Sequence, residues 1–459
     1  MSEAERERFT VLDQAVAQRG ERRSLPRAGL LMAVGLGLGN AVNYAYNIAM
    51  SRLLGPSAYG ALAALLALVL IGAVPGLALQ AVVARHSALR AGDERAVAAL
   101  WSGILVATLA FGAALGVAAV AAAPVVGAFL HLGSLGPGLW LAATLVPLPA
   151  LAAVQGMLQG SERFGALAAL LVLNAAGKLA AGLGLVALGG RVGAALSGAV
   201  AGEVVALLAG LCYVRRDLTL SKLGKGEGER RERGAVGLAR EVWEASAAML
   251  GLLLLTNLDT PLARHYLDAH EAGLYAVGAI MAKIAFWGPQ FVGMVVFPRL
   301  VTARVGTEAG DAGVPSSGDQ ARRRYLTGAL AVVATLGALL VVTTAAAPHL
   351  AVLLPFGVRY REVGPLLPLF AALGTMLALA QLVLFSGIAA ADRRTGRLPL
   401  AAALAEAAVI ALALHHSIIQ VAAAATGTAA ALLAAGWLLE RRRERSAIAT
   451  TGQSQGVIA

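Results

Sequence analysis

Three asparagines lie on one face of a long apolar stretch near the start of the chain. Asn40, Asn43 and Asn47 follow one another at spacings of three and four residues, so a helix would carry them in one row together with Tyr44. Side-chain amides donate and accept hydrogen bonds, so the row could bind a hydroxyl-rich ligand such as a sugar, or it could join neighbouring helices. Asn257, in the corresponding stretch of the second half, favours the ligand-binding interpretation.

Lys178 and Glu203 are charged residues inside two consecutive apolar stretches. A charge at the centre of a bilayer costs about 2.5–3.5 kcal/mol on insertion scales, so it is expected to have a partner or a function. Both residues are about a dozen positions from the turn between the stretches, which is the same depth on adjacent antiparallel helices. They could form an ion pair, or Lys178 could face a cavity and bind an anionic group while Glu203 tunes its charge.

The second half of the sequence places three more charges in apolar stretches, at Asp259, Lys283 and Glu406. Asp259 and Lys283 lie at depths that differ by a few residues, so any ion pair between them would be looser. Glu203, Asp259 and Glu406 are the candidate ion-coupling carboxylates, which could carry a proton or a sodium ion. For Asp259 a structural role as the partner of Lys283 or of Arg264 stays equally open.

Arg52 and Arg264 stand at the ends of the first and seventh apolar stretches. Each guanidinium could extend to the membrane interface, or the two could form a positive rim that receives and releases an anionic ligand. Gln290 could line the same path or join helices. The chain has one cysteine, Cys212, and no metal-ligand spacing, phosphate-binding loop or nucleophile constellation, so we expect no metal, no cofactor and no enzymatic activity.

These residues must be positioned by membrane-spanning helices. Hydrophobic residues make up 58% of the 459 residues and charged residues 14%, against about 45–50% and about 25% in soluble domains. A spanning helix requires about 20 mainly apolar residues. We therefore expect an all-α integral membrane protein with about 12 transmembrane helices. The twelve stretches lie near residues 28–50, 59–83, 100–122, 139–158, 166–188, 193–213, 242–265, 272–297, 326–347, 364–389, 398–414 and 418–438.

The placement of the basic residues predicts the orientation of the chain. If the N-terminus is cytoplasmic, the inner segments contain 30 of the 37 Lys and Arg residues, whereas the outer segments contain five. This is the bias of the positive-inside rule, so both termini are expected in the cytoplasm. The same short segments account for the net charge of +11, so no nucleic-acid partner is expected.

The sequence divides into two halves of six stretches each. A Gly-rich segment of mixed charge has the composition of a linker and separates the halves. The predicted parts are a cytoplasmic N-tail at 1–27, an N-lobe at 28–213, a cytoplasmic linker at 214–241, a C-lobe at 242–438 and a cytoplasmic C-tail at 439–459.

The two halves also share a motif between their first and second stretches. Arg52 precedes Gly60 by eight residues, and Arg264 precedes Gly273 by nine. Because each half has an even number of crossings, both halves enter the membrane from the same side and the repeat is parallel. Such repeats are related by an axis along the membrane normal, with a substrate path between the lobes. We therefore expect a central cavity between the two lobes.

Several short motifs resemble a known family. The run from Asn43 through Arg52-Leu-Leu-Gly-Pro-Ser-Ala-Tyr-Gly60 is similar to the opening of polysaccharide transporters, the O-antigen-type flippases of the multidrug/oligosaccharidyl-lipid/polysaccharide exporter superfamily. Leu158-Gln-Gly-Ser-Glu-Arg-Phe164 is similar as well. So is Asn257-Leu-Asp259 followed by Glu271-Ala-Gly-Leu-Tyr275. The resemblance extends over residues 28–438 and includes the helix count and the six-plus-six layout.

This resemblance implies a function in the bacterial cytoplasmic membrane. Family members carry an undecaprenyl-pyrophosphate-linked oligosaccharide or polysaccharide precursor from the inner to the outer leaflet by alternating access. The implied partners are the lipid-linked glycan, membrane lipids, and a glycan polymerase or glycosyltransferase. The alternative is a cation-coupled multidrug or small-molecule exporter of the same superfamily. The mixed charges within the helices do not separate the two, and the motifs favour the flippase.

Overall fold

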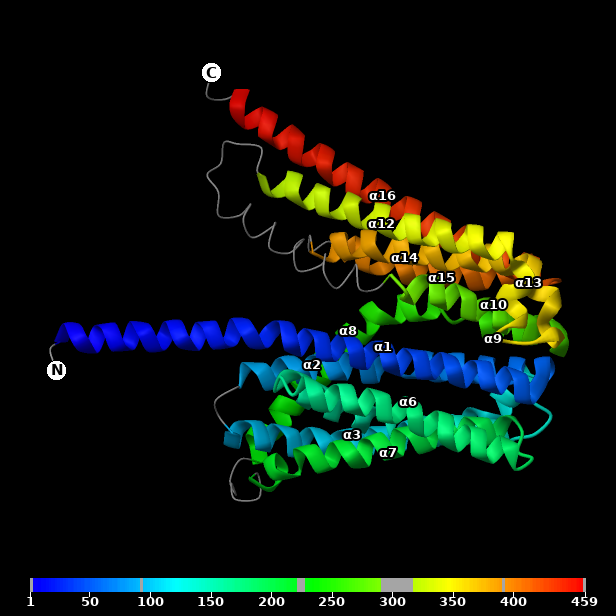
Figure 1. Cartoon of the computed structure of the whole chain (residues 1–459), viewed down its shortest axis with the longest axis horizontal. Helices are drawn as coiled ribbons and strands as arrows, with labels where there is room; N and C mark the ends of the chain where they lie inside the picture. The colour runs from blue at the N-terminus through cyan, green and yellow to red at the C-terminus, as the bar shows by residue number, and fades with distance from the viewer. Residues whose placement is uncertain (1–2, 91–93, 221–227, 290–316, 390–392, 457–459) are drawn as a thin grey trace. The chain divides into compact units, whose positions relative to one another are not determined.

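The computed structural model of the chain describes residues 3–90, 94–220, 228–289, 317–389 and 393–456. Within these ranges the regular elements are helices, without strands, which confirms the all-α prediction (Figure 1). Parts of the predicted linker and Gln290 lie outside them. The helices of the first half are α1 (Glu3–Gly72), α2 (Val74–Leu89), α3 (Glu94–Phe129), α4 (Gly136–Leu145), α5 (Leu148–Gly160), α6 (Phe164–Ala187) and α7 (Val192–Leu220).

The second half begins with α8, which includes the end of the predicted linker, and it contains several short elements. Its helices are α8 (Gly228–Leu255), α9 (Asp259–Tyr266), α10 (Ala269–Trp287), α12 (Ser317–Ala346), α13 (Pro348–Leu353), the 3-10 helix η2 (Val358–Leu366), α14 (Leu367–Ala389), α15 (Arg393–Leu412) and α16 (Ile418–Gly456).

Described helices lie in each of the twelve predicted stretches, and the eighth stretch is described as far as residue 289. Eight segments of the described ranges are long and apolar enough to cross a membrane, or nine if α8 and α9 form one bent span. The first of these, Leu31–Leu89, has 59 residues, which is enough for two crossings. Gly55 divides it, because its φ of 73° ends one helix and only glycine adopts this value readily. Helices α10 and α15 supply the two remaining stretches.

The described chain forms two compact units that do not simply follow the two halves of the sequence. Unit 1 contains Met1–Ala49, Pro75–Ala123 and Gly138–Trp243. Unit 2 contains the rest, and it includes two short segments of the first half, Met50–Val74 and Pro124–Pro137, together with Glu244–Ala459. The predicted N-lobe and C-lobe are halves of the sequence, and they remain a prediction.

The core of unit 1 is built around α5. This helix is buried along most of its length, and Val154, Met157 and Leu158 have no exposed surface. They belong to one apolar cluster with Trp101. The Trp101 indole, 1% exposed, donates a hydrogen bond from Nε1 to the Ser87 hydroxyl at 2.9 Å. A buried indole therefore keeps its polar atom paired, as such groups generally must.

Helices α6 and α7 of unit 1 pack backbone against backbone. A Cβ atom at Gly198 would lie 2.6 Å from the Gly182 nitrogen, and one at Gly202 would lie 2.7 Å from the Lys178 nitrogen. Gly198 and Gly202 form a small-xxx-small pattern, which allows this close approach in membranes. The glycine seam therefore brings residues at 178 and 203 next to each other.

In unit 2 the long helices α12, α14 and α16 pack side by side, and α10 packs against α14 (Figure 1). Glycine again permits the closest contact, since a Cβ at Gly374 of α14 would lie 2.0 Å from the Ala282 carbonyl oxygen of α10. The short elements α9, α13 and η2 lie at one end of this unit (Figure 1). The two segments of the first half that belong to this unit, Met50–Val74 and Pro124–Pro137, contact these short elements.

Candidate functional site

The ammonium group of Lys178 on α6 is directed toward α1. Its Nζ atom donates a hydrogen bond to Asn43 Oδ1 at 3.4 Å and lies 4.4 Å from the centroid of the Tyr46 ring. A cation over an aromatic face is attracted by the ring, more strongly where water is excluded. Tyr46 is fully buried, and its hydroxyl donates to the Ala195 carbonyl oxygen of α7 at 2.8 Å, which fixes the ring.

Glu203 on α7 provides the opposite charge. Its side chain is buried and interacts electrostatically with Lys178. Lys178 and Glu203 therefore lie near each other, as their equal depth predicts. One carboxylate oxygen, Oε2, has no hydrogen-bond partner among the described residues. Lys178 is consequently shared between a carboxylate, an amide oxygen and an aromatic ring, which is an environment that could bind an anion without leaving a bare positive charge.

The asparagine row on α1 bonds mainly to its own helix. The Asn43 amide nitrogen donates to the Gly39 carbonyl oxygen at 3.2 Å, and that of Asn47 donates to the Asn43 carbonyl oxygen at 2.8 Å. Asn40 is exposed, whereas Asn43 and Asn47 are half-buried. The structure thus joins Asn43 to Lys178, but its contacts do not decide between a ligand-binding row and a helix-joining row.

Unit 2 holds the second charged group, centred on Asp259 at the start of α9. Asp259 Oδ1 accepts hydrogen bonds from the Thr260 backbone nitrogen at 2.7 Å and from the Thr260 hydroxyl at 3.2 Å. Its Oδ2 accepts one from the Tyr275 hydroxyl at 2.7 Å. The break between α8 and α9 makes the backbone donor available, because the first N–H groups of a helix have no partner within it. Lys283 on α10 interacts electrostatically with this carboxylate.

Glu406 on α15 lies near the same group. It is 1% exposed, interacts electrostatically with Asp259, and accepts a hydrogen bond from the Thr428 hydroxyl at 3.1 Å. Within the described ranges, Glu406 Oε1 and Asn257 Oδ1 are buried oxygens without a hydrogen-bond partner. Asp259 therefore interacts with the Lys283 ammonium group and with a second carboxylate, and a bound proton or a monovalent cation would balance the extra negative charge.

A small cavity opens beside Asp259 and Lys283. Its other walls are mainly apolar, apart from Thr256, and come from α8, α10 and α14; they are Leu255, Ala279, Ala282, Phe286, Leu373 and Leu377. Its volume of about 10 Å³ is room for about one water molecule. The cavity thus places one cation and one carboxylate at the edge of an apolar surface.

Arg52 and Arg264, predicted as a rim, use their guanidinium groups to bind backbone carbonyl oxygens within unit 2. Three of the predicted site residues therefore lie around Lys178 in unit 1, namely Asn43, Lys178 and Glu203. In unit 2, Lys283 and Glu406 interact with Asp259, and Asn257 precedes Asp259 by two residues in the sequence. Asn40 and Asn47 lie on α1 of unit 1.

Sequence reasoning did not identify Tyr46, Tyr275 or Thr428. Each contacts a charged residue that was predicted, through a ring face or a hydroxyl. A lone tyrosine or threonine in an apolar stretch carries no spacing signal. The one available clue for Tyr46 is its place among the polar residues of α1, three positions after Asn43.

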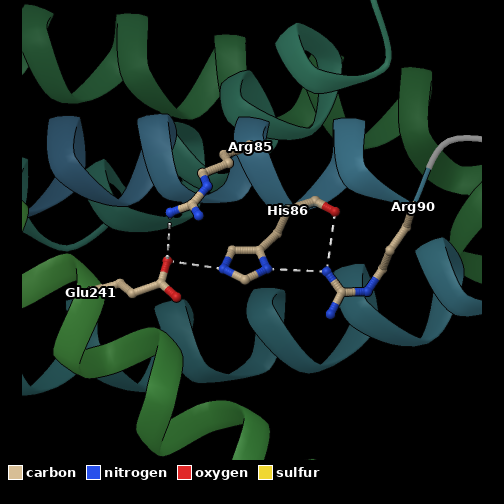
Figure 2. A network of polar contacts seen from close by, with 4 residues as sticks. All are labelled: Arg85, His86, Arg90 and Glu241. Carbon is tan, nitrogen blue, oxygen red and sulfur yellow. Dashed lines mark hydrogen bonds and ion pairs between the residues drawn. The ribbon is translucent and has the colours of Figure 1, made fainter. Parts of the chain in front are cut away.

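A further polar network fastens α8 to α2 in unit 1 (Figure 2). His86 Nε2 lies 3.0 Å from Glu241 Oε2, and Arg90 Nη1 lies 3.1 Å from His86 Nδ1. A guanidinium only donates and a carboxylate only accepts, so both contacts fit a neutral imidazole with its proton on Nε2. Arg85 Nη1 adds an ion pair to Glu241 at 3.7 Å. Glu241 precedes Glu244, the residue of α8 at which unit 2 resumes, so this network holds the last part of α8 that belongs to unit 1.

Solved structures with the same fold are membrane transporters. An inward-facing multidrug resistance transporter of the MATE family in the MOP superfamily has a TM-score of 0.73 at 14% identity, covering 90% of this chain and 96% of that chain. The lipid II flippase MurJ in an inward closed conformation has a TM-score of 0.69 at 10% identity, covering 90% and 87%. A search of curated proteins gave no match. The chain therefore shares the fold of these membrane transporters, and at least eight of its described segments are long and apolar enough to cross a membrane.

Residues 27–303, more than half of the chain, match the model of one protein family, described as polysaccharide biosynthesis protein. The chain belongs to this family. The predicted family is confirmed by this match, and the predicted all-α membrane fold is confirmed by the shared fold.

The pairing of Lys178 and Glu203 leads to a stability prediction. Lys178→Gln leaves a buried carboxylate without its counter-charge, which should destabilise the fold by about 3–5 kcal/mol. Adding Glu203→Gln removes the orphaned charge, so the double variant should recover most of the loss. Thermal unfolding of the purified protein in one detergent measures both. Equal melting temperatures for the wild type and Lys178→Gln would show that the two charges do not stabilise each other.

Proposed function

We propose that this protein flips a lipid-linked oligosaccharide or polysaccharide precursor, carried on undecaprenyl pyrophosphate, from the inner to the outer leaflet by alternating access. The family match over residues 27–303 is the observation on which the proposal rests. MurJ, which shares the fold, is a lipid II flippase. In this proposal the membrane is the bacterial cytoplasmic membrane, both termini are cytoplasmic, and a glycan polymerase or glycosyltransferase acts on the same precursor.

The Lys178 group has the chemistry that such a cargo requires. A pyrophosphate needs a cation, and Lys178 provides one beside the half-buried amide of Asn43. Sugar hydroxyls need groups that both donate and accept hydrogen bonds, and asparagine amides do both. Glu203 reduces the net charge of the site, which would favour release of the pyrophosphate over permanent binding. In unit 2, Lys283, which interacts with Asp259, is a second candidate contact for the anion.

The Asp259 group is the proposed site of ion coupling. Its two carboxylates outnumber the one ammonium, and Glu406 Oε1 and Asn257 Oδ1 are buried oxygens without a hydrogen-bond partner in the described ranges. Oxygen atoms of this kind suit either a proton shared by carboxylates or a sodium ion. Binding or release of that ion changes the charge beside Lys283. We propose that this change drives the conformational cycle.

The alternative function is a cation-coupled multidrug or small-molecule exporter. The observation that favours it is the TM-score of 0.73 to a MATE-family transporter, which exceeds the 0.69 to MurJ. At 14% and 10% identity this difference concerns the fold alone. The two functions differ in the charge of their cargo, because a drug exporter commonly carries an organic cation.

Depletion of the protein tests the function in cells. The lipid-linked glycan should accumulate in the inner leaflet and the surface glycan should fall, because the precursor no longer reaches the enzymes outside. Extraction of lipid-linked glycans, with surface-glycan staining, measures both. Re-expression of the wild type should restore the surface glycan, whereas the Lys178→Gln/Glu203→Gln variant at equal abundance should not. Normal surface glycan without accumulated precursor, in a strain lacking paralogues, would contradict the proposal.

Replacement of Glu406 tests ion coupling. Glu406→Gln keeps the shape of the side chain but holds no exchangeable proton and binds a cation weakly, so transport should lose its dependence on the driving ion gradient. The measurement is transport in vesicles with and without a proton or sodium gradient. Glu440→Gln is the matched control, since Glu440 is also a buried carboxylate of unit 2 but bonds to Ser386. A Glu406→Gln variant that still follows the gradient like the wild type would exclude this coupling site.

A further inference from the structure

Arg52 and Arg264 occupy equivalent positions in the two halves of the sequence. Each ends the first stretch of its half and precedes a glycine, Gly60 or Gly273, by eight or nine residues. Both arginines belong to unit 2, although one comes from each half of the sequence. Their contacts can therefore be compared directly within one compact unit.

Arg52, from the first half, binds the end of a helix from the second half. Its Nε atom donates a hydrogen bond to the Pro355 carbonyl oxygen at 2.7 Å, and its Nη2 atom donates to that of Leu354. Leu354 directly follows α13, which ends at Leu353. The last carbonyl groups of a helix lack partners within it and carry the negative end of the helix dipole. The guanidinium therefore caps α13.

Arg264, from the second half, does the same to a helix from the first half. Its Nε atom donates to the Leu130 carbonyl oxygen at 3.0 Å, and its Nη2 atom donates to that of His131 at 3.4 Å. Both residues directly follow α3, which ends at Phe129. Its Nη1 atom lies 3.5 Å from the Ser57 carbonyl oxygen, which also belongs to the first half. Each arginine thus caps a helix of the opposite half.

The backbones between these two caps are in close contact. A Cβ atom at Gly60 would lie 2.8 Å from the Gly273 nitrogen, and one at Gly273 would lie 2.1 Å from the Pro56 carbonyl oxygen. The equivalent glycines of the two halves therefore pack directly against each other. Only glycine fits at either position, so this junction needs the halves to meet in one register.

Ring contacts accompany each cap. Beside the Arg264 cap, the His265 ring stacks on Phe129 with 4.2 Å between centroids, and its Nδ1 atom donates to the Phe129 carbonyl oxygen at 2.9 Å. Beside the Arg52 cap, the Tyr360 hydroxyl donates to the Ser51 carbonyl oxygen at 2.9 Å. In both places a side chain of the second half binds a backbone oxygen of the first half.

We propose that Arg52 and Arg264 form a reciprocal latch. It holds residues 50–74 and 124–137 of the first half against the second half, and it must release before a path can open at this end of the molecule. The charge bias assigns this end to the outside of the membrane. The latch does not depend on the identity of the cargo, and so it goes beyond the proposed function and would serve a glycan flippase or a drug exporter equally.

The chemistry of the caps suits a latch that opens. Hydrogen bonds from a guanidinium to carbonyl oxygens are charge-assisted, yet both partners can bind water instead at the membrane surface. Because there are two caps, the loss of one leaves the other closed. Arg264 is 8% exposed and Arg52 is exposed, so water competes less with the hydrogen bonds of Arg264 than with those of Arg52. Removal of Arg264 should therefore open the junction more than removal of Arg52.

A distance measurement across the latch tests this proposal. Spin labels at Leu53→Cys and Val358→Cys, which are exposed positions on opposite halves within unit 2, report the separation in lipid nanodiscs after Cys212→Ala. The wild-type background should give one short distance. Arg52→Gln and, more strongly, Arg264→Gln should add a longer distance, with the open-to-closed ratio rising about tenfold per lost cap. The double variant should be mostly open, and Arg264→Lys should fall between wild type and Arg264→Gln.

Arg361→Gln is the matched control, because it removes the same charge from an exposed position on η2 of the same unit. It should leave the short distance unchanged. Only variants that match the wild type in elution volume and melting temperature are compared. If Arg264→Gln fails to fold, Arg52→Gln, at an exposed position, tests the latch. An unchanged distance distribution in the folded variants, or the same change in Arg361→Gln, would overturn the latch.

Discussion

A charged group in an apolar medium needs a compensating group nearby, and the organisation of this protein follows from that constraint. Lys178 is held by Glu203, Asn43 and the Tyr46 ring, and Asp259 is held by Tyr275, Thr260 and Lys283. The arginines at 52 and 264 find helix carbonyl oxygens. The contact of Lys178 with Asn43 and the two arginine contacts tie together elements that are far apart in the sequence, whereas Asp259 is compensated by residues of α9 and the next helix, α10. The same contacts hold the fold and define the sites.

The two units compensate their buried charges differently, and the difference corresponds to two kinds of bound ion. In unit 1 one cation faces one carboxylate beside hydrogen-bonding amides, an arrangement that can exchange an anionic partner. In unit 2 two carboxylates face one cation, with the orphaned oxygens of Glu406 and Asn257, an arrangement that can exchange a cation or a proton. Close glycine contacts make the first arrangement possible, because the seam at Gly198 and Gly202 brings Lys178 and Glu203 together.

Much of this could be predicted from the sequence, because the rise of a helix is fixed. The position of one turn was sufficient to place Lys178 and Glu203 at the same depth, and the length of the apolar stretches was sufficient for the helix count. What could not be predicted depends on how each helix is rotated. Tyr46 rather than Tyr44 lies under Lys178, and Thr428 reaches Glu406, because of packing that no spacing encodes. The carbonyl partners of Arg52 and Arg264 carry no signal at all, since every residue has a carbonyl group.

The central claim is that the chain moves an anionic, lipid-linked glycan and uses Lys178 to do so. Its most direct test is reconstitution in liposomes that contain an undecaprenyl-pyrophosphate-linked oligosaccharide, with an impermeant glycosidase added outside. The wild-type protein should make the glycan of the inner leaflet accessible to the enzyme, and the Lys178→Gln/Glu203→Gln variant, equally folded, should not. A wild-type protein that leaves the inner glycan protected, yet moves an organic cation along an ion gradient, would contradict it.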